Sequence, residues 1–352
     1  MTGIPVAETP DREFLPLELI KAAGKQRTDA GAWAYLNAAA GDGRAAKRSR
    51  EAYLQTTLLP RVCRDVSVVD LTTRWLGKDM SSPFAIAPMA SHELFDASGE
   101  QGTAEGAGNS DVPLILSMET SQPWSSIEVE RKWCQISPQQ DDGLVRSLIE
   151  AAEEAGAEAI ILTLDTPVPG MRYEQRRALP EFPTHINRPM LPTSNVRWDA
   201  YTWAGLDWSA VEVIVDYANI PVLGKGVLHP DDALRCSDSG MSGVVVSNHG
   251  GRNFDALPAP LSQLPSIADA VGDQDLVLVD GGIRSGSDVL VALAHGAHGV
   301  LIGRPVLWGL SAAGPSGVAE VLSIFREELE QAMALCGVCE ITDINRSLLV
   351  GD

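Results

Sequence analysis

Eight short, strongly apolar runs recur between residues 84 and 302, and this repeat restricts the possible fold more than any other feature of the sequence. The runs are Phe84–Pro88, Val112–Ser117, Trp133–Ile136, Ala159–Thr163, Val222–Lys225, Gly243–Ser247, Leu276–Asp280 and Gly299–Ile302. Short runs that are apolar throughout are typical of strands buried on both faces of a parallel sheet. Amphipathic stretches such as Leu144–Ala155 and Asp288–His295 lie between them and predict helices.

Eight strands alternating with helices are the count of a (β/α)8 barrel, which an α/β chain of 352 residues is long enough to form. An open doubly wound sheet would carry a glycine-rich fingerprint after its first strand, and none follows Pro88. We therefore predict a single TIM-barrel domain over 1–352. It consists of an N-terminal helical extension at 13–83, the barrel at 84–310, and a C-terminal helix and tail at 311–352.

Two segments outside the repeat are also interpretable. In the extension, we expect a helix around Ala32–Ala40 and a strand pair near Thr57–Leu71. The segment Val168–Leu206 follows the fourth strand and is long and rich in proline and polar residues. Because such long loops in a compact barrel usually have a function or are disordered, we interpret it as a lid over the site.

The charge balance limits the partners of this chain. Lys and Arg number 27 against 47 Asp and Glu, which gives a formal net charge of −20. Such a chain repels phosphate backbones, so we expect no nucleic-acid partner. An anionic substrate would need a local cluster of basic side chains.

The five cysteines are scattered, which favours reduced thiols and a cytoplasmic location. Cys336 and Cys339 form a C-x-x-C, but the stretch Glu328–Cys336 indicates a helix, so two thiols on one helical face are favoured over a metal or redox site. No signal peptide is evident in residues 1–12. No apolar run reaches the roughly 18 residues of a membrane span, so we expect no membrane association.

Residues capable of chemistry gather where the apolar runs end. In a parallel barrel, the carboxyl ends of the strands face the active site. Two matching turns, Asp280–Arg284 and Ile302–Arg304, combine glycine with arginine after the last two strands. One Gly-Gly pair alone would indicate only a tight turn. Together, at the usual phosphate site of this fold, the two turns predict a cofactor that carries phosphate.

A second group suggests proton transfer beside an anion-binding site. His249 lies in a glycine turn three residues before Arg252, so a base stands next to a cation that could hold a carboxylate. Asp165 could orient the imidazole or could simply cap the turn before Pro167. Lys225 could form a structural ion pair or stabilise negative charge on a cofactor.

In these motifs, the chain resembles a known family, the FMN-dependent α-hydroxy-acid oxidases and dehydrogenases. The resemblance runs from about Leu17 to Leu348 and is strongest in Ser247-Asn248-His249-Gly250-Gly251-Arg252, which looks like the family's active-site signature. The stretches Val279–Gly286 and Ile302–Pro305 look like its FMN-phosphate turns.

The resemblance implies oxidation of a 2-hydroxy acid to the 2-oxo acid with FMN as cofactor. It implies that His249 takes a proton with support from Asp165, and that Lys225 stabilises the reduced flavin. The side chains implied to bind the substrate acid are those of Arg252, Arg172 and Tyr35. The other positions implied to contact FMN are Ala87, Pro88, Met89, Ser117, Gln135, Thr163, Ser247, Asp280, Gly282, Arg284, Gly303 and Arg304.

Two departures from the family pattern concern the substrate. Ser137 stands where the family usually has a second active-site tyrosine, and Glu119 stands where a bulky apolar side chain often lines the pocket. A roomier and more acidic pocket predicts a substrate that is larger or more polar than glycolate or lactate and that could carry an amine. The alternative is that Glu119 points to solvent in the lid.

The electron acceptor and assembly are also expectations from the resemblance. Ala90 resembles the oxidase pattern, so O2 or a soluble acceptor is expected to reoxidise the flavin. The family suggests a homo-oligomer, often a tetramer. Two alternatives stay open: an FMN barrel acting on an α-amino or carrier-tethered acid, and a non-catalytic barrel. No metal site is expected.

Overall fold

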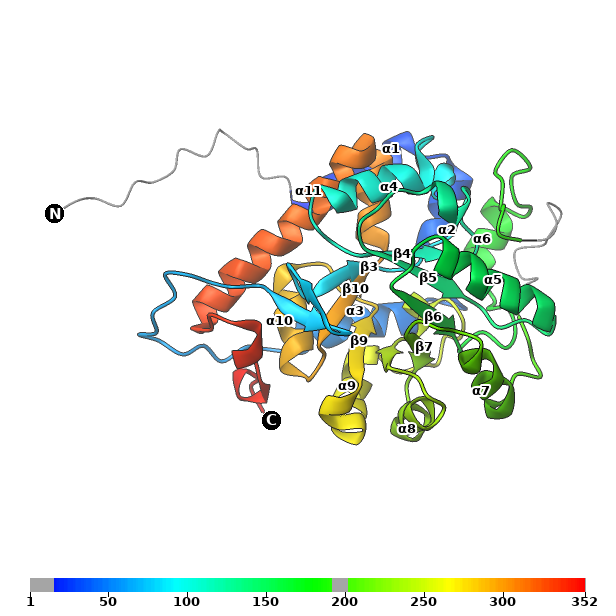
Figure 1. Cartoon of the computed structure of the whole chain (residues 1–352). Helices are drawn as coiled ribbons and strands as arrows, with labels where there is room; N and C mark the ends of the chain where they lie inside the picture. Colours follow the sequence, from blue (N-terminus) through cyan, green and yellow to red (C-terminus); the bar gives the residue numbers. More distant parts are fainter. Residues whose placement is uncertain (1–15, 192–201, 352) are drawn as a thin grey trace.

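The computed structural model describes residues 16–191 and 202–351. Within them, eight strands form a closed parallel barrel in chain order, and the last strand pairs back with the first (Figure 1). The barrel strands are β3 (Phe84–Ile86), β4 (Leu114–Ser117), β5 (Lys132–Ile136), β6 (Ala159–Thr163), β7 (Val222–Val227), β8 (Gly243–Val246), β9 (Leu276–Asp280) and β10 (Gly299–Ile302). Each predicted apolar run overlaps one of these strands, so the (β/α)8 prediction is confirmed.

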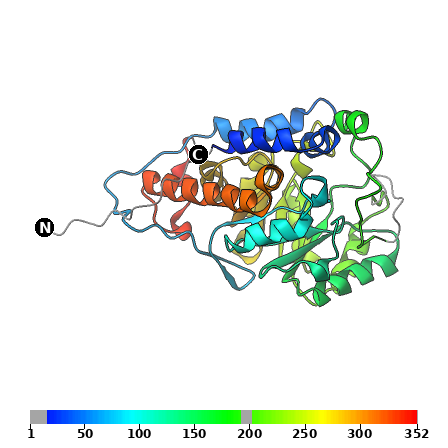
Figure 2. The same ribbon diagram turned by 90° about the horizontal axis from the view of Figure 1, so that it is seen from above.

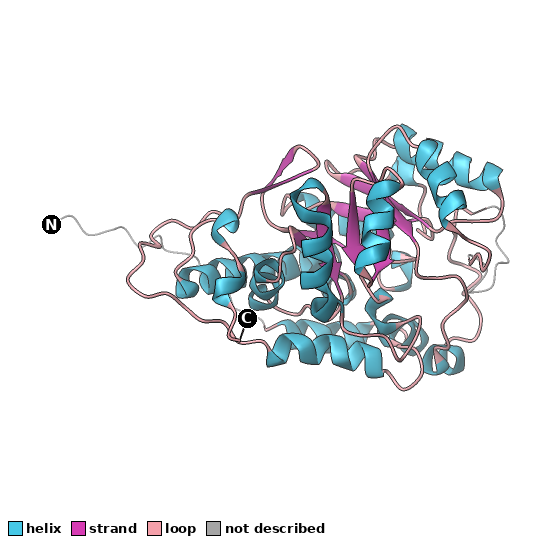
Figure 3. Cartoon of the chain, turned by 90° about the horizontal axis from the view of Figure 1, so that it is seen from below, coloured by secondary structure: helices cyan, strands magenta, loops and turns pink. Residues whose placement is uncertain are grey.

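Helices surround the barrel and cover its outer face (Figure 3). They are α1 (Leu17–Arg27), α2 (Ala30–Asn37), α3 (Arg44–Gln55), α4 (Gly99–Gly108), α5 (Asp142–Glu154), α6 (Tyr173–Ala178), α7 (Trp208–Asp216), α8 (Pro230–Asp238), α9 (Pro260–Val271), α10 (Gly286–Ala294) and α11 (Arg304–Cys336). Both predicted barrel helices are present as α5 and α10. Their starts follow from capping: Asp141 accepts a hydrogen bond from the amide of Leu144, and Ser285 accepts one from Asp288.

A small hairpin closes the amino-terminal end of the barrel. Strands β1 (Thr73–Trp75) and β2 (Lys78–Met80) are antiparallel and turn at Leu76 and Gly77, which both have positive φ, as a tight two-residue hairpin requires. Trp75 and Met80 are buried in the same cluster as the side chains that fill the barrel, and Trp75 stacks at a tilt on Trp133. The interior is therefore packed from this end, and only the carboxyl end remains for a site.

The N-terminal extension is helical, as predicted, but the prediction of a strand pair near Thr57–Leu71 is wrong. The helix α2 overlaps the predicted stretch Ala32–Ala40, whereas residues 57–71 form no strand pair with each other. Instead, they bond to the chain's other end through isolated bridges from Leu58 to Leu349 and from Asp70 to Glu340. The extended backbone of these residues thus hydrogen-bonds to the C-terminal segment. The hairpin lies further along the chain, at β1 and β2, where Gly77 permits the turn.

The long helix α11 crosses the predicted boundary between the barrel and the C-terminal tail. It bends at Ala313 and Gly314, ahead of Pro315, and α1 packs along it (Figure 2). The helix ends at Cys336 because Gly337 adopts the left-handed conformation, with φ of 73°. Cys339 therefore lies beyond the helix, and the prediction of two thiols on one helical face is wrong.

The predicted lid is described only in part, since residues 192–201 of Val168–Leu206 lie outside the described residues. Its described portion contains α6, and Pro169, Arg172 and Thr202 line the cavity at the carboxyl end of the barrel. In the described part of the chain, no helix has both the length and the apolar character needed to cross a membrane.

Candidate active site

A cavity opens at the carboxyl end of the barrel, and all but two of the predicted site residues line it. They come from the ends of the barrel strands, from α2 and from the lid. The predicted residues in the wall are Tyr35, Ala87, Pro88, Met89, Ser117, Glu119, Gln135, Ser137, Thr163, Arg172, Lys225, His249, Arg252, Asp280, Gly282, Arg284, Gly303 and Arg304. Asp165 and Ser247 lie directly behind them and contact His249.

His249 and Asp165 form a hydrogen-bonded pair. The Nδ1 atom of His249 lies 3.0 Å from Oδ1 of Asp165, which leaves Nε2 of the imidazole for the cavity. The backbone of His249 has a φ of 57°, and its amide donates to the Ser247 hydroxyl at 3.0 Å. Gly226 makes room for the pair, because a Cβ there would lie 2.3 Å from Cβ of Asp165.

Burial by itself raises the pKa of Asp165, but the nearby positive charges of His249 and Lys225 outweigh it and lower the pKa overall. Asp165 therefore stays ionised and can stabilise a protonated imidazole. The carboxylate of Asp165 contacts His249, which favours the interpretation that it orients the imidazole over that of a turn cap.

Lys225 lines the cavity, and the charges of Asp280 and Asp165 act on it. Its Nζ is 3.3 Å from Oδ2 of Asp280 and 3.2 Å from the Ser247 hydroxyl. Burial by itself lowers the pKa of Lys225, but the charges of Asp280 and Asp165 raise it by more. The pKa is therefore raised overall, and the ammonium remains charged. Lys225 thus makes a structural ion pair and also faces the cavity, and the two interpretations of this residue are compatible.

Two partly buried arginines near α2, Arg252 and Arg172, line the cavity and could hold an acid. Arg252 donates from Nη1 to the carbonyl oxygens of Tyr35 at 2.8 Å and Ala38 at 3.0 Å. Burial, and then the charge of Arg172, lower the pKa of Arg252 to about 9. The positive charge here is thus poorly compensated by the protein, and a carboxylate would relieve it. The Tyr35 ring lies 5.0 Å from the Arg252 guanidinium.

A second pair of partly buried arginines, Arg284 and Arg304, lies after β9 and at the start of α11. Burial lowers the pKa of each to about 10, helped by Arg50 in the case of Arg284 and by Arg284 itself in the case of Arg304. The amino terminus of α11 adds the positive end of a helix dipole. Clustered cations without enough counter-charge at a helix start fit a phosphate group.

Arg304 also joins the two arginine pairs through the backbone. It donates from Nε to the carbonyl oxygen of Leu36 at 3.1 Å and from Nη2 to those of Gly250 at 2.9 Å and Ala38 at 3.4 Å. Since Ala38 also accepts from Arg252, one carbonyl at the end of α2 binds an arginine of each pair.

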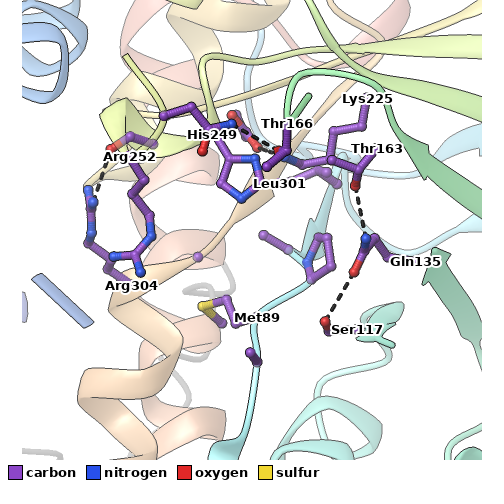
Figure 4. Close-up of a pocket in the computed structure, with 18 of the residues that line it drawn as sticks. Met89, Ser117, Gln135, Thr163, Thr166, Lys225, His249, Arg252, Leu301 and Arg304 are labelled. Carbon is purple, nitrogen blue, oxygen red and sulfur yellow. Dashed lines mark hydrogen bonds and ion pairs between the residues drawn. The ribbon is translucent and has the colours of Figure 1, made fainter. Parts of the chain in front are cut away.

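A row of polar side chains crosses the strand ends opposite the arginines. The Ser117 hydroxyl donates to Gln135 at 3.0 Å, and the Gln135 amide donates to Thr163 at 2.9 Å (Figure 4). The same amide donates to the Ser137 hydroxyl at 3.1 Å. These strands therefore present fixed hydrogen-bonding groups to a ligand in the cavity.

The residues present fit FMN. Besides the arginine pair for its phosphate, Oδ1 of Asp280 is buried and has no hydrogen-bond partner among the described residues, so it can accept from a sugar-like hydroxyl. Gly282 was expected to let a ligand approach, but a Cβ there would lie 2.3 Å from the carbonyl oxygen of Ser49 in α3. That glycine is required by helix packing as well.

Glu119 does not point to solvent, and its charge is not isolated. Its Oε2 lies 3.3 Å from Nη1 of Arg188, a lid residue whose side chain is 2% exposed. The expected acidic wall is therefore compensated by an arginine. Sequence reasoning missed Arg188, because it lies 69 positions from Glu119 in a loop without a repeat or motif.

The fold and site together define a flavin-dependent (β/α)8-barrel oxidoreductase. The chain belongs to the FMN-dependent dehydrogenase family, whose model matches residues 24–351. It is 38% identical to an L-lactate oxidase of Roseobacter sp. (strain GAI101) over 98% of each chain. It is also 38% identical to a 4-hydroxymandelate oxidase of Amycolatopsis orientalis over 85% of this chain and 88% of the relative.

Solved structures of mandelate oxidase share the fold of this chain. A mandelate oxidase with (S)-4-hydroxymandelic acid superposes with a TM-score of 0.89 at 33% identity, covering 96% of this chain and 98% of that one. The predicted family, FMN dependence and oxidation of a 2-hydroxy acid are thus confirmed, while these relatives leave the substrate undetermined.

Proposed function

We propose that this chain is a 2-hydroxy-acid oxidase, which converts an (S)-2-hydroxy acid to the 2-oxo acid and passes the two electrons to O2, forming hydrogen peroxide. The observation that supports the reaction most directly is the His249–Asp165 pair beside Arg252 and Arg172 in one cavity. The names of the relatives support O2 as the acceptor. Ala90, in the cavity wall, matches the pattern expected of oxidases.

In this reaction, FMN, when bound, supplies the two-electron acceptor. Arg252 and Arg172 would hold the substrate carboxylate and so fix the C2 atom, because guanidinium groups bind carboxylates in a defined plane. The free Nε2 of His249 would take the proton released as the alcohol becomes a ketone. Asp165 would stabilise the resulting imidazolium through its 3.0 Å contact.

Four further groups would prepare the site. Lys225 would hold positive charge next to the electron-accepting ring. Asp280, Arg284 and Arg304 would hold the ribityl and phosphate portion, and the row from Ser117 to Thr163 would fix the ring's polar edge. Tyr35 would donate a hydrogen bond to the substrate, and burial raises its pKa, so the phenol keeps its proton.

The test is anaerobic flavin reduction in the wild type and in His249→Gln. The variant should keep bound flavin but lose about 10²–10⁴-fold in the rate of reduction, the usual contribution of a positioned base. His229→Gln, at an exposed position where His229 caps α8, is the matched control and should reduce at the wild-type rate. Near-normal reduction in His249→Gln would remove His249 from this role.

Two other outcomes would replace the proposal. If 2-amino acids reduce the flavin and 2-hydroxy acids do not, the alternative chemistry on amino acids holds. A colourless protein that cannot be reconstituted with FMN would point to a non-catalytic barrel.

A further inference from the structure

The wall of the cavity also contains a charged pair that the proposed reaction does not use. Glu119 follows β4, lines the cavity and is 27% exposed at its side chain, whereas Arg188 lies behind it. The contact at 3.3 Å joins Oε2 of Glu119 to Arg188. Arg188 also lies over the Phe182 ring, 4.1 Å from its centre, which fixes the guanidinium within the lid.

This pair places a hydrogen-bond acceptor rather than a free negative charge in the wall. Burial raises the pKa of Glu119, while Arg188, Arg172 and His249 oppose that rise. Oε2 is engaged by Arg188, so Oε1 is the oxygen that can accept from a ligand. A neutral donor can bind there without a new charge being buried.

Ser137 adds a second polar group beside Glu119. Its hydroxyl accepts from the Gln135 amide at 3.1 Å, which leaves its own hydrogen to donate into the cavity. Its amide lies 3.1 Å from the sulfur of Met118, the residue next to Glu119, so the two loop ends are packed together. The wall thus offers one acceptor and one donor where a tyrosine and an apolar side chain were expected.

We propose that Glu119, held by Arg188, and Ser137 form a specificity subsite for a neutral hydroxyl on the distal end of the substrate. This inference rests on the proposed function and names its substrate class: 2-hydroxy acids that carry a second, uncharged hydroxyl group.

The surrounding charges exclude the two charged alternatives. A distal ammonium would lie close to the guanidinium groups of Arg188 and Arg172, which oppose the attraction of Glu119. The amine-bearing substrate suggested by the sequence is therefore disfavoured. A distal carboxylate would meet Glu119 itself, and like charges in a partly buried pocket repel strongly. Only a neutral donor satisfies the wall without an unpaired charge.

A series of acids with the same four-carbon chain tests this charge selection. Its members are 2-hydroxybutanoate, 2,4-dihydroxybutanoate, 4-amino-2-hydroxybutanoate and 2-hydroxybutanedioate, which differ only in the distal group. The corresponding five-carbon series covers a longer reach. The readouts are kcat/KM for anaerobic flavin reduction and the Kd of the matching 2-oxo acids from the flavin absorbance change. At the favoured length, the wild type should prefer the hydroxyl member over its methyl counterpart by about tenfold in both.

Three variants assign the preference to the pair. Glu119→Gln keeps an acceptor but loses the charge. Glu119→Leu/Arg188→Leu removes both partners of the 3.3 Å contact together, so neither of these two charges is left buried without the other. In the double variant, the hydroxyl-to-methyl ratio should fall to about one. Glu130→Leu, at an exposed position before β5, is the control and should leave the ratio unchanged.

The outcomes separate this inference from the proposed function. A wild type that reduces its flavin fastest with the methyl, ammonium or carboxylate member at both lengths overturns the subsite and leaves the reaction intact. A hydroxyl preference that survives in the double variant also overturns it. No reduction with any 2-hydroxy acid overturns the proposed function, and the subsite with it.

Discussion

The substitution Asp165→Asn tests how much of the base's power comes from its buried carboxylate. The side chain keeps its shape but loses the charge 3.0 Å from Nδ1 of His249. Two unit charges at that separation interact by about 5 kcal/mol at an effective dielectric constant of about 20. The His249 side chain is 33% exposed, so solvent screens the interaction, and the charge of Lys225 partly offsets that of the carboxylate. We therefore expect the effective interaction energy to be about half of this value. A loss of about 2–3 kcal/mol corresponds to roughly 10²-fold in rate.

The assay is stopped-flow reduction of the bound flavin by a 2-hydroxy acid without oxygen. Thr166→Val is the matched control, because Thr166 is an uncharged donor to the same Oδ1 at 3.1 Å. Its loss should cost less than about tenfold. Reduction by Asp165→Asn within threefold of the wild type, or an equal loss in Thr166→Val, would refute the electrostatic role.

Further predictions concern the cofactor site and acid stability. Arg284→Met should raise the Kd of FMN by about tenfold or more, measured by flavin fluorescence, because a phosphate partner is lost. Lys225→Met should cost about 3–5 kcal/mol in urea unfolding, since it leaves the buried carboxylate of Asp280 without its ion-pair partner; a cost under about 1 kcal/mol would contradict the ion pair. The pKa of Asp165 lies below the ordinary value of about 3.8 for an aspartate, so its ionised form stabilises the fold above about pH 4. The Tm difference between wild type and Asp165→Asn should therefore shrink as the pH falls from 6 to 3, and a growing difference would reverse the sign we assign.

The barrel could be predicted from the sequence because its signal is local. Each strand is apolar on both faces, and each ends in the residues that the site uses, so pattern and position coincide. The same holds for His249 and Arg252, which one short turn places together. Asp165 could be predicted because β6, like β8, ends at the carboxyl end of the barrel.

The features that could not be predicted from the sequence depend on contacts between segments that are far apart in the chain. Residues 57–71 have the composition of strands, but their hydrogen-bond partners come from the C-terminal segment, such as Leu348 for Leu59. Arg188 reaches Glu119 only once the lid has folded over β4. The end of α11 at Cys336 was set by Gly337, a local signal that could have been read.

The carbonyl oxygen of Ala38 connects the binding of the cofactor to the binding of the substrate. It accepts from Arg252 on the acid side and from Arg304 on the phosphate side. A phosphate that orders Arg304 therefore also steadies the anchor of Arg252, and linkage requires the reverse to hold. The holoprotein should bind a 2-oxo acid more tightly than the apoprotein does, so the end of α2 makes cofactor loading a precondition for tight substrate capture.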